Sequence, residues 1–178
     1  MEAAKDGKEK AAFKEMPLCG DYDIRIAADG SWFYQGSRIN RPALPKLFAT
    51  VLSRDDGGDF WLITPYERGR VVVDDAPFTV VEMNKSGEGL RSVFTLRTNL
   101  DHEIVLGPDN PIRVEIDPET EEPRPYVLVK EKLEALVLRS VFYHLVDQAE
   151  EATIDGQPHI GIWSSGHFFP IDKHQSAF

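Results

Sequence analysis

The stretch VVVDDAPFTVVE, residues 71–82, reads as an apolar strand, a turn that contains Asp-x-Pro, and a second strand. Valine favours strands, whereas Asp and Pro favour the turns that end them. A second stretch, IVLGPDNPIRVE at residues 104–115, has the same order of strand, Asp-x-Pro turn and strand. The two stretches predict a strand-rich chain in which one pattern occurs twice.

Two helical patterns form a second internal similarity. Apolar residues recur at the same three- and four-residue steps after Arg41 and after Arg139: Leu44, Leu47, Phe48 and Val51, and Phe142, Leu145, Val146 and Ala149. This spacing predicts a helix with one buried face in each place. Leu133, Leu136 and Val137 are assigned to a helical face as well. A strand with a tryptophan follows each helix, at residues 60–64 and 160–163.

These patterns predict an α+β protein with two pseudo-repeated strand-helix-strand halves and antiparallel sheets. A polar tail is expected over residues 1–18, where an Ala-, Lys- and Glu-rich segment can form a helix that ends at Pro17. The N-terminal half is expected over residues 19–84 and the C-terminal half over residues 85–178. Further strands are expected at residues 24–26, 32–34, 70–73, 79–83, 92–97, 103–106, 112–116, 126–129 and 168–169.

Composition limits the class of protein. Hydrophobic residues make up 42% of the 178 residues, which is enough to bury a core. The net charge of −10 disfavours binding to duplex nucleic acid, although a few arginines can still hold a small anion. No apolar run reaches the roughly 20 residues of a membrane span.

The location inside the cell follows from the start of the chain and from its cysteine content. The first residues lack the apolar centre of a signal peptide. Cys19 is the single cysteine, so the chain has no internal disulfide. We therefore expect a cytoplasmic protein.

Motifs for catalysis and for metal or cofactor binding are missing from the sequence. The histidines form no HExxH and no Cys-x-x-Cys is present, so no metal site is predicted. The sequence also lacks the G-x-S-x-G elbow of serine hydrolases, the P-loop and the G-x-G-x-x-G dinucleotide motif. We expect no cofactor, and an enzyme is the less favoured class.

Polar and aromatic residues at the ends of predicted elements form the best candidate ligand site. Arg41 and Arg139 occupy matching places near the two helix starts, where a cation is unfavourable for the helix dipole and therefore calls for another reason. One reason is a salt bridge, and the other is an anionic ligand. The proposed ligand-binding set is Arg41, Arg97, Thr98, Asn99, Arg139, Trp163 and Ser164. The arginines would neutralise an anion, the polar groups would orient it, and Trp163 would stack on it.

Several longer motifs resemble one known family. The segments DGSWFYQGSRINRP, DFWLITPYERGRVVVDDAPF, LRTNLDHEIVLGPDNP, PRPYVLV, LEALVLRSVFYHLV and GIWSSGHFFPI occur in order between about residues 20 and 172. They are similar to the bacterial family catalogued as domain of unknown function 1285. The resemblance implies a duplicated α+β architecture whose C-terminal half is similar to pleckstrin-homology-like domains. It also implies a ligand surface between the halves and a role in signalling, but no catalytic residues.

The leading hypothesis is a non-enzymatic regulatory protein that binds a small anionic, nucleotide-type molecule between its halves. Two alternatives remain open. One is a small hydrolase that uses His144 or His167 with a carboxylate. The other is a protein-interaction module without a small ligand, which an exposed apolar patch or an open sheet edge would favour.

Overall fold

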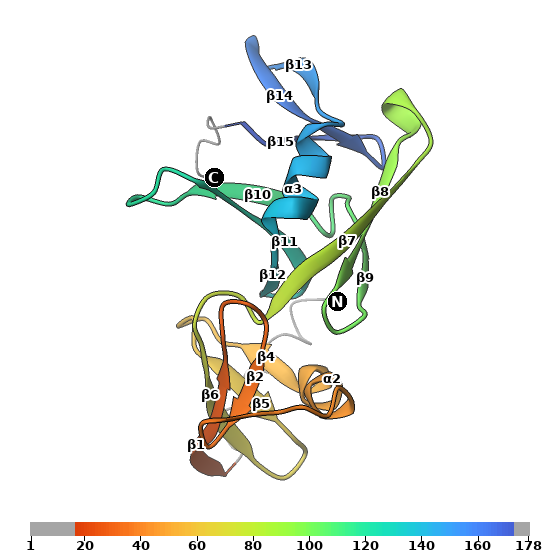
Figure 1. Ribbon diagram of the computed structural model, residues 1–178. Helices are drawn as coiled ribbons and strands as arrows, with labels where there is room; N and C mark the ends of the chain where they lie inside the picture. The colour runs from red at the N-terminus through yellow and green to blue at the C-terminus, as the bar shows by residue number, and fades with distance from the viewer. Residues whose placement is uncertain (1–16, 173–178) are drawn as a thin grey trace, which may run out of the picture. The chain divides into compact units, whose positions relative to one another are not determined.

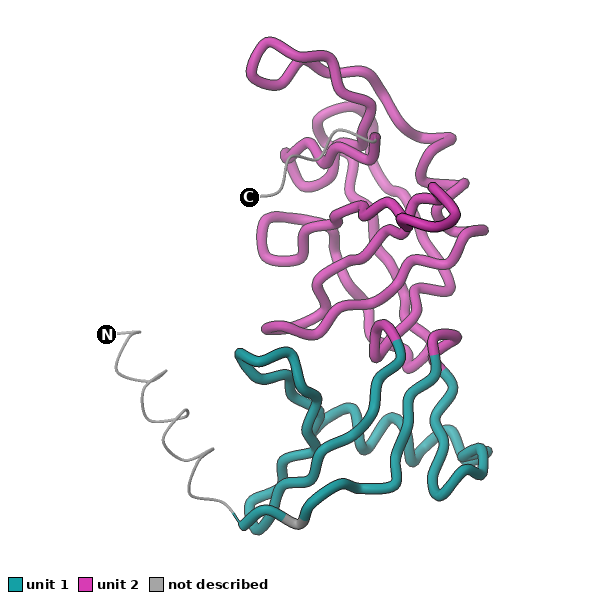
Figure 2. The backbone as a smooth tube through the Cα atoms, turned by 90° about the vertical axis from the view of Figure 1, so that its left-hand side faces the viewer, with its two compact units in different colours: residues 1–27, 31–74 teal, residues 28–30, 75–178 magenta. Residues whose placement is uncertain are grey.

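The computed structural model describes residues 17–172, which form two compact units (Figure 2). The first unit contains the described residues up to Ala27 and Ser31–Asp74, and the second contains Ala28–Gly30 and the described residues from Asp75 onward. The division thus falls at Asp74 and Asp75, ten residues before the boundary expected at residue 84. The expected N-terminal helix lies outside the described residues.

The first unit is a six-stranded sheet with one helix. Its strands have the order β3-β2-β1-β6-β5-β4. The elements are β1 (Leu18–Ile26), β2 (Trp32–Tyr34), β3 (Ser37–Arg38), α2 (Ala43–Thr50), β4 (Leu52–Arg54), β5 (Phe60–Ile63) and β6 (Arg68–Val73).

The second unit has a six-stranded sheet of order β10-β11-β12-β7-β8-β9, which curls into a half-barrel, and a three-stranded sheet of order β13-β14-β15 (Figure 1). The elements of the larger sheet are β7 (Phe78–Ser86), η1 (Gly89–Arg91), β8 (Val93–Thr98), β9 (Glu103–Val105), β10 (Ile112–Ile116), β11 (Pro123–Lys130) and β12 (Leu133–Val137). They are followed by α3 (Arg139–Val146), β13 (Glu150–Ile154), β14 (Gln157–Ser164) and β15 (His167–Pro170).

The two larger sheets share one topology. Each consists of two successive three-stranded antiparallel meanders, and the first strand of the first meander pairs in parallel with the last strand of the second. The parallel pairs are β1 with β6 and β7 with β12. The prediction of antiparallel sheets was therefore wrong at the centre of each sheet. Residue patterns show that a segment is a strand, but they do not show which distant strand it pairs with.

The helices occupy different places in this shared topology. In the first unit α2 connects the two meanders, whereas α3 follows the second meander and leads into the small sheet. The sequence similarity between the two helical patterns thus aligned elements that are not topologically equivalent. The second similarity also aligned segments that are not equivalent. Residues 71–82 join the two units along the chain, whereas residues 104–115 join the two meanders of the second unit.

The helix α2 buries a different face from the one predicted. Pro45 and Ala49 are buried, whereas Leu44 and Leu47 are exposed. Small residues allow close approach of the helix to the sheet, and Phe48 then stacks on Trp32 with a centroid distance of 6.1 Å. In α3, Phe142 and Leu145 are buried as predicted, together with Val141. Val146 is instead 44% exposed, and Ala149 lies beyond the end of the helix.

The segment Leu133–Val137 was predicted as part of a helical face, and this was wrong. It is the strand β12, in which Leu133, Ala135 and Val137 are buried and alternate with less buried residues. Its pairing with β11 on one side and β7 on the other decides this conformation. A five-residue segment is too short to separate the two periodicities, so tertiary pairing settles such cases. The strand β13 was also missed.

No helix in residues 17–172 has the length and hydropathy needed to cross a membrane.

Candidate functional site

Arg97, Thr98 and Asn99 form the end of β8 and the turn that follows it. The Arg97 guanidinium pairs with Glu82 and, at 3.0 Å, with Asp101. The fully buried Thr98 hydroxyl accepts hydrogen bonds from the backbone N–H groups of Leu100 and His102, at 3.4 and 3.0 Å. These contacts fix the β8–β9 turn.

Asn99 holds two other segments of the second unit. Its side-chain oxygen accepts a hydrogen bond from the Thr79 N–H at 3.1 Å, and its amide nitrogen donates to the Gly30 carbonyl at 3.1 Å. Both sides of the amide group are thus used within the fold.

Trp163 and Ser164 end the strand β14. The fully buried Ser164 hydroxyl accepts a hydrogen bond from Phe94 N–H at 3.0 Å and donates to the Leu106 carbonyl at 2.8 Å. Trp163 lies against Phe168 of β15, with ring centroids 5.3 Å apart. Ser164 therefore ties the small sheet to β8 and to the end of β9.

The two remaining predicted residues, Arg41 and Arg139, lie in different units. Arg41 is exposed in the connection before α2, where its carbonyl accepts a hydrogen bond from Leu44 N–H at 3.0 Å. Arg139 is the first residue of α3 and its side chain is 63% exposed. Its guanidinium pairs with the side chain of Glu122, which is 49% exposed. Of the seven predicted residues, Arg139 is the one that lines the cavity described next.

A cavity of about 310 Å³ opens at the start of α3 in the second unit. Its wall is formed by the β10–β11 connection, the end of β12 and the first turns of α3. The polar lining includes Asp117, Glu122, Arg124 and Arg139, and the apolar lining includes Leu138 and Phe142. A largely apolar cavity of this size with a few convergent polar groups fits a small ligand.

Arg124 forms the more buried side of this cavity. Its Nη2 atom donates to Asp75 at 2.6 Å, its Nη1 atom to Asp117 at 3.3 Å, and its Nε atom to the Tyr126 hydroxyl at 3.1 Å. The Tyr126 hydroxyl in turn donates to Asp75 at 2.8 Å. Burial, followed by the contact with Asp75, raises the pKa of Tyr126 to about 12, so this hydroxyl keeps its proton at neutral pH.

The start of α3 adds a weak positive potential to the cavity. Leu138 precedes the helix without a side-chain cap, and the first turn contains no acidic residue. The first N–H groups of a helix lack partners within the helix, and the helix dipole favours an anion beside them. Arg139 places a formal positive charge at the same position.

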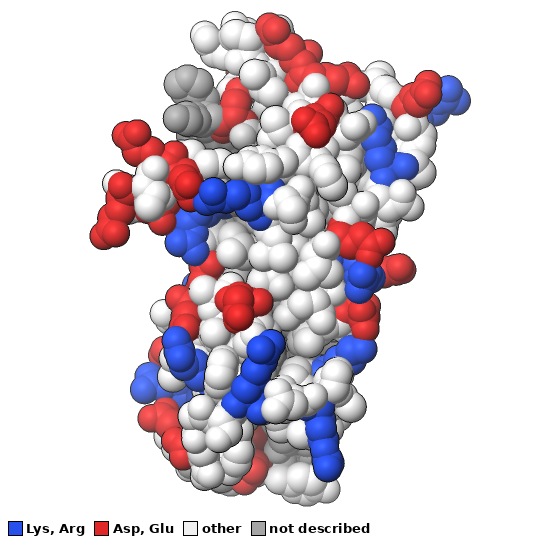
Figure 3. All heavy atoms as spheres, in the orientation of Figure 1, with Lys and Arg blue, Asp and Glu red and all other residues white. Residues whose placement is uncertain are grey.

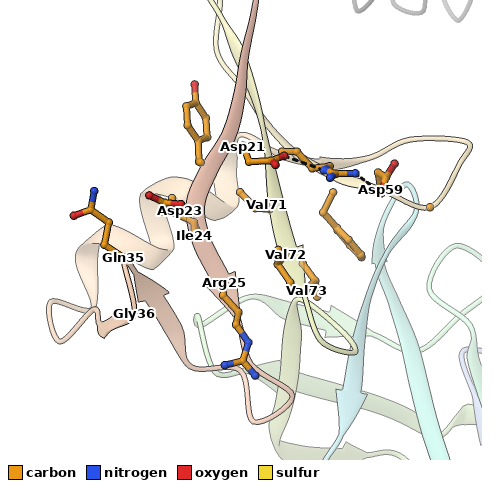
Figure 4. Close-up of a pocket in the computed structure, with 14 residues that line it drawn as sticks. Asp21, Asp23, Ile24, Arg25, Gln35, Gly36, Asp59, Val71, Val72 and Val73 are labelled. Carbon is orange, nitrogen blue, oxygen red and sulfur yellow. Dashed lines mark hydrogen bonds and ion pairs between the residues drawn. The ribbon is translucent and has the colours of Figure 1, made fainter.

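A second, more open hollow of about 780 Å³ lies over β1 and β6 in the first unit (Figure 4). Its two arginines are already paired: Arg70 contacts Asp21 at 3.0 Å and Asp59 at 3.7 Å, and Arg25 binds Asp74. Asp23 and Gln35 lie on the side opposite Asp59 in Figure 4. With three aspartates against two arginines in its lining, this hollow disfavours an anion.

Arg124 and its contacts were missed by the sequence analysis. The acidic stretch before it was interpreted as an exposed loop, and Arg124 lies between Pro123 and Pro125 at the end of that stretch. The sequence did contain one signal for Arg124, which is its position between two prolines at the start of a predicted strand.

None of the histidines within residues 17–172 lines the cavity. His144 on α3 and His167 on β15 are exposed. The one histidine–carboxylate contact among residues 17–172 joins His159 Nδ1 to Asp172 at 3.3 Å. Within the described part of the chain, no group of three His, Cys, Asp or Glu residues is placed to hold a metal ion.

His102 is enclosed next to Phe78, with the two rings edge to face and 5.1 Å apart. Its Nδ1 atom is buried without a hydrogen-bond partner in the described structure. Burial lowers the pKa of His102, the charge of Lys130 lowers it further, and Asp101 acts in the opposite direction.

The lowered pKa of His102 predicts a loss of stability in mild acid. An unfolded histidine titrates near pH 6.5, so the unfolded chain binds more protons than the folded one just below that pH. The free energy of unfolding should therefore fall between about pH 7 and pH 5. Urea unfolding across this range should show a shallower pH dependence for His102→Phe than for the parent. The exposed-site control His144→Gln should keep the parental slope, and equal slopes in all three proteins would contradict this role of His102.

The fold and the cavity at α3 define a mostly β protein of two units with a candidate small-ligand site. The chain belongs to the DUF1285 family. Residues 15–76 match the N-terminal domain of unknown function of this family, and residues 77–171 match the C-terminal domain of its proteins of unknown function.

Two solved structures are similar to this chain. A DUF1285 family protein from Silicibacter pomeroyi DSS-3 is 48% identical with a TM-score of 0.81, and the alignment covers 88% of this chain and 83% of that one. A DUF1285 family protein from Shewanella baltica OS155 is 24% identical with a TM-score of 0.57 over 71% of this chain and 91% of that one. The second similarity concerns the fold alone. No curated protein matches the sequence.

Proposed function

We propose that this protein is a non-enzymatic regulatory protein, and that the cavity at the start of α3 binds a small anionic, partly aromatic molecule of the nucleotide type. The observation that carries the proposal is the position of Arg139. Its guanidinium lines the cavity, and its ion pair with Glu122 is exposed on both sides.

Exchange of Glu122 for a ligand anion costs little. An exposed ion pair contributes only about 0–1 kcal/mol, because water screens it and both side chains lose freedom. A phosphate or carboxylate that reaches the fork of Arg139 makes charge-assisted hydrogen bonds, each of about 1.5–3 kcal/mol. Arg124 is held by the less exposed Asp75 and so stays in place as the fixed wall.

The apolar wall supports the aromatic part of the ligand. Phe142 is buried, Leu138 is partly buried, and Tyr143 is 56% exposed at the cavity. A flat ring can pack against such side chains while its anionic group faces the helix start. Release of Glu122 would free the connection between β10 and β11, which gives ligand binding a conformational output.

The proposal includes a pleckstrin-homology-like character of the second unit and a role in signal transduction. The curled sheet with a helix directly after its last strand, β12, supports the first point. The single cysteine supports a cytoplasmic location. A chain with one cysteine has no internal disulfide, and proteins of the reducing cytosol rarely contain disulfides.

Nucleotide binding tests the proposal directly. A thermal-shift screen of nucleoside mono-, di- and triphosphates should identify a ligand whose affinity is then measured by calorimetry. Arg139→Ala should weaken binding roughly 10- to 100-fold, because it removes charge-assisted hydrogen bonds. Glu122→Gln should strengthen binding, because it removes the competing carboxylate while keeping its shape.

Arg91 provides the matched control, since it is an exposed arginine outside this cavity. Arg91→Ala should bind like the parent. If no nucleotide raises the melting temperature, or if Arg139→Ala binds as the parent does, the proposal fails. An equal loss in Arg97→Ala would move the site away from this cavity.

A further inference from the structure

One stretch of this acidic chain contains basic residues and no acidic ones. Residues 37–54 contain Arg38, Arg41, Lys46 and Arg54 and no Asp or Glu, although the whole chain has a net charge of −10. Arg54 is used internally, where it donates to the Gly58 carbonyl and lies over the ring of Phe60. Of the other three cations, Arg38 ends β3, Arg41 lies in the connection before α2, and Lys46 lies in α2.

The outward side of α2 adds exposed leucines to these cations. Pro45 and Ala49 face the core, so Leu47 lies on the opposite side of the helix and is 60% exposed, with Leu44 beside it at 38%. We define the α2 surface as Arg38, Arg41, Leu44, Lys46 and Leu47. In Figure 3, Lys and Arg side chains flank uncharged surface where Figure 1 places α2.

The two arginines of the α2 surface are available to a partner. Among the described residues, neither the Arg38 nor the Arg41 guanidinium makes an ion pair or a hydrogen bond. These two arginines and the two exposed leucines are complementary to a surface that carries carboxylates and an exposed aliphatic side chain. Anionic membranes are a poorer fit, because they attract clusters of about 4–8 basic residues and would repel the rest of this chain.

The second unit of the same chain carries a surface of that kind. Its described residues include 8 Lys and Arg but 19 Asp and Glu. On the edge strand β13, Glu150 and Glu151 are exposed, and Glu151 lies opposite Ile160 of β14, which is 53% exposed. Directly opposite residues in an antiparallel pair point to the same face, so carboxylate and isoleucine are presented together.

We propose that the α2 surface binds the acidic β13 edge of a second copy of this chain. Each copy carries both surfaces, so two identical contacts can close a symmetric dimer about a two-fold axis. In each contact Arg38 and Arg41 face Glu151, and the leucines pack near Ile160, which shares the sheet face of Glu151. The proposal is independent of the ligand cavity at α3.

Sedimentation velocity of the whole chain over a concentration series tests the dimer. The parent should dimerise at low ionic strength and dissociate as salt is added, because exposed charges contribute to the contact. Arg41→Glu and Glu151→Arg should each weaken dimerisation roughly tenfold or more, since each places like charges opposite one another. The control Arg91→Glu has the same charge change elsewhere and should dimerise like the parent.

Mixing the two variants gives the decisive result. In a dimer of one Arg41→Glu copy and one Glu151→Arg copy, one contact has the reversed pair and the other has the native pair, so association should return to the parental level. A parent that stays monomeric at all concentrations would overturn the proposal. Failure of the mixture to associate would also overturn the dimer proposal. Binding of the parent to anionic vesicles through Arg41, with no dimer in solution, would overturn it in favour of a membrane contact.

Discussion

Replacing Phe78 by alanine should lower the free energy of unfolding by about 3–5 kcal/mol. Phe78 is fully buried at the start of β7, where it pairs with Ala135 in the parallel contact between β7 and β12. This contact joins the two meanders of the second unit into one sheet. The ring of His102 also meets Phe78 edge to face. The truncation would leave a cavity where neighbours from both meanders meet, and packed strands collapse into such a cavity only partly.

Urea unfolding followed by tryptophan fluorescence and by circular dichroism measures this loss. Val81→Ala in the same strand is the matched control, because Val81 is 37% exposed. We expect the control to lose less than about 1 kcal/mol, as is usual for exposed positions. Similar losses in the two variants would show that Phe78 does not hold the meanders together.

Replacing Ser164 by alanine should lower the free energy of unfolding by about 2–3 kcal/mol, because a buried hydrogen-bonding group is left without its partner. The hydroxyl is fully buried and serves the N–H of Phe94 and the carbonyl of Leu106. The Leu106 carbonyl also accepts a hydrogen bond from the Ser165 hydroxyl at 2.9 Å, so the N–H of Phe94 is the group that loses most.

Ser165→Ala is the control for this prediction, since Ser165 is exposed and donates to the same carbonyl. Its loss should stay below about 1 kcal/mol. The comparison also separates the two roles considered for Ser164. A Ser164→Ala protein with parental stability and weakened nucleotide binding would support a ligand contact and contradict the internal role described above.

Short-range signals located most of the strands. Residues 112–116 were predicted as a strand and form β10, and the hairpin around Asp29-Gly30 joins β1 to β2. The turn residues Gly, Pro, Asn and Asp impose local backbone conformations whatever the rest of the chain does. The same local reasoning failed for Leu133–Val137, whose five residues fit a helix as well as a strand.

The candidate site could be predicted less completely than the strands. Arg139 was identified from its unfavourable place at a helix start, and it lines the cavity at α3. Arg124 also lines the cavity and was not identified, because its role depends on Asp75, which is 49 residues distant along the chain. Thr98 and Ser164 were chosen for their polarity, and the structure gives both hydroxyls backbone partners.

The sequence by itself determined that this chain is strand-rich and that Arg139 starts a helix. These features depend on side-chain periodicity and turn chemistry, which act over a few residues. Only the tertiary structure decided that β1 pairs with β6, and β7 with β12, in parallel. It also decided which hydroxyls form hydrogen bonds within the fold and that Leu47 faces outward. Those outcomes depend on which distant segments come together and bury one another, and no local pattern encodes the partner.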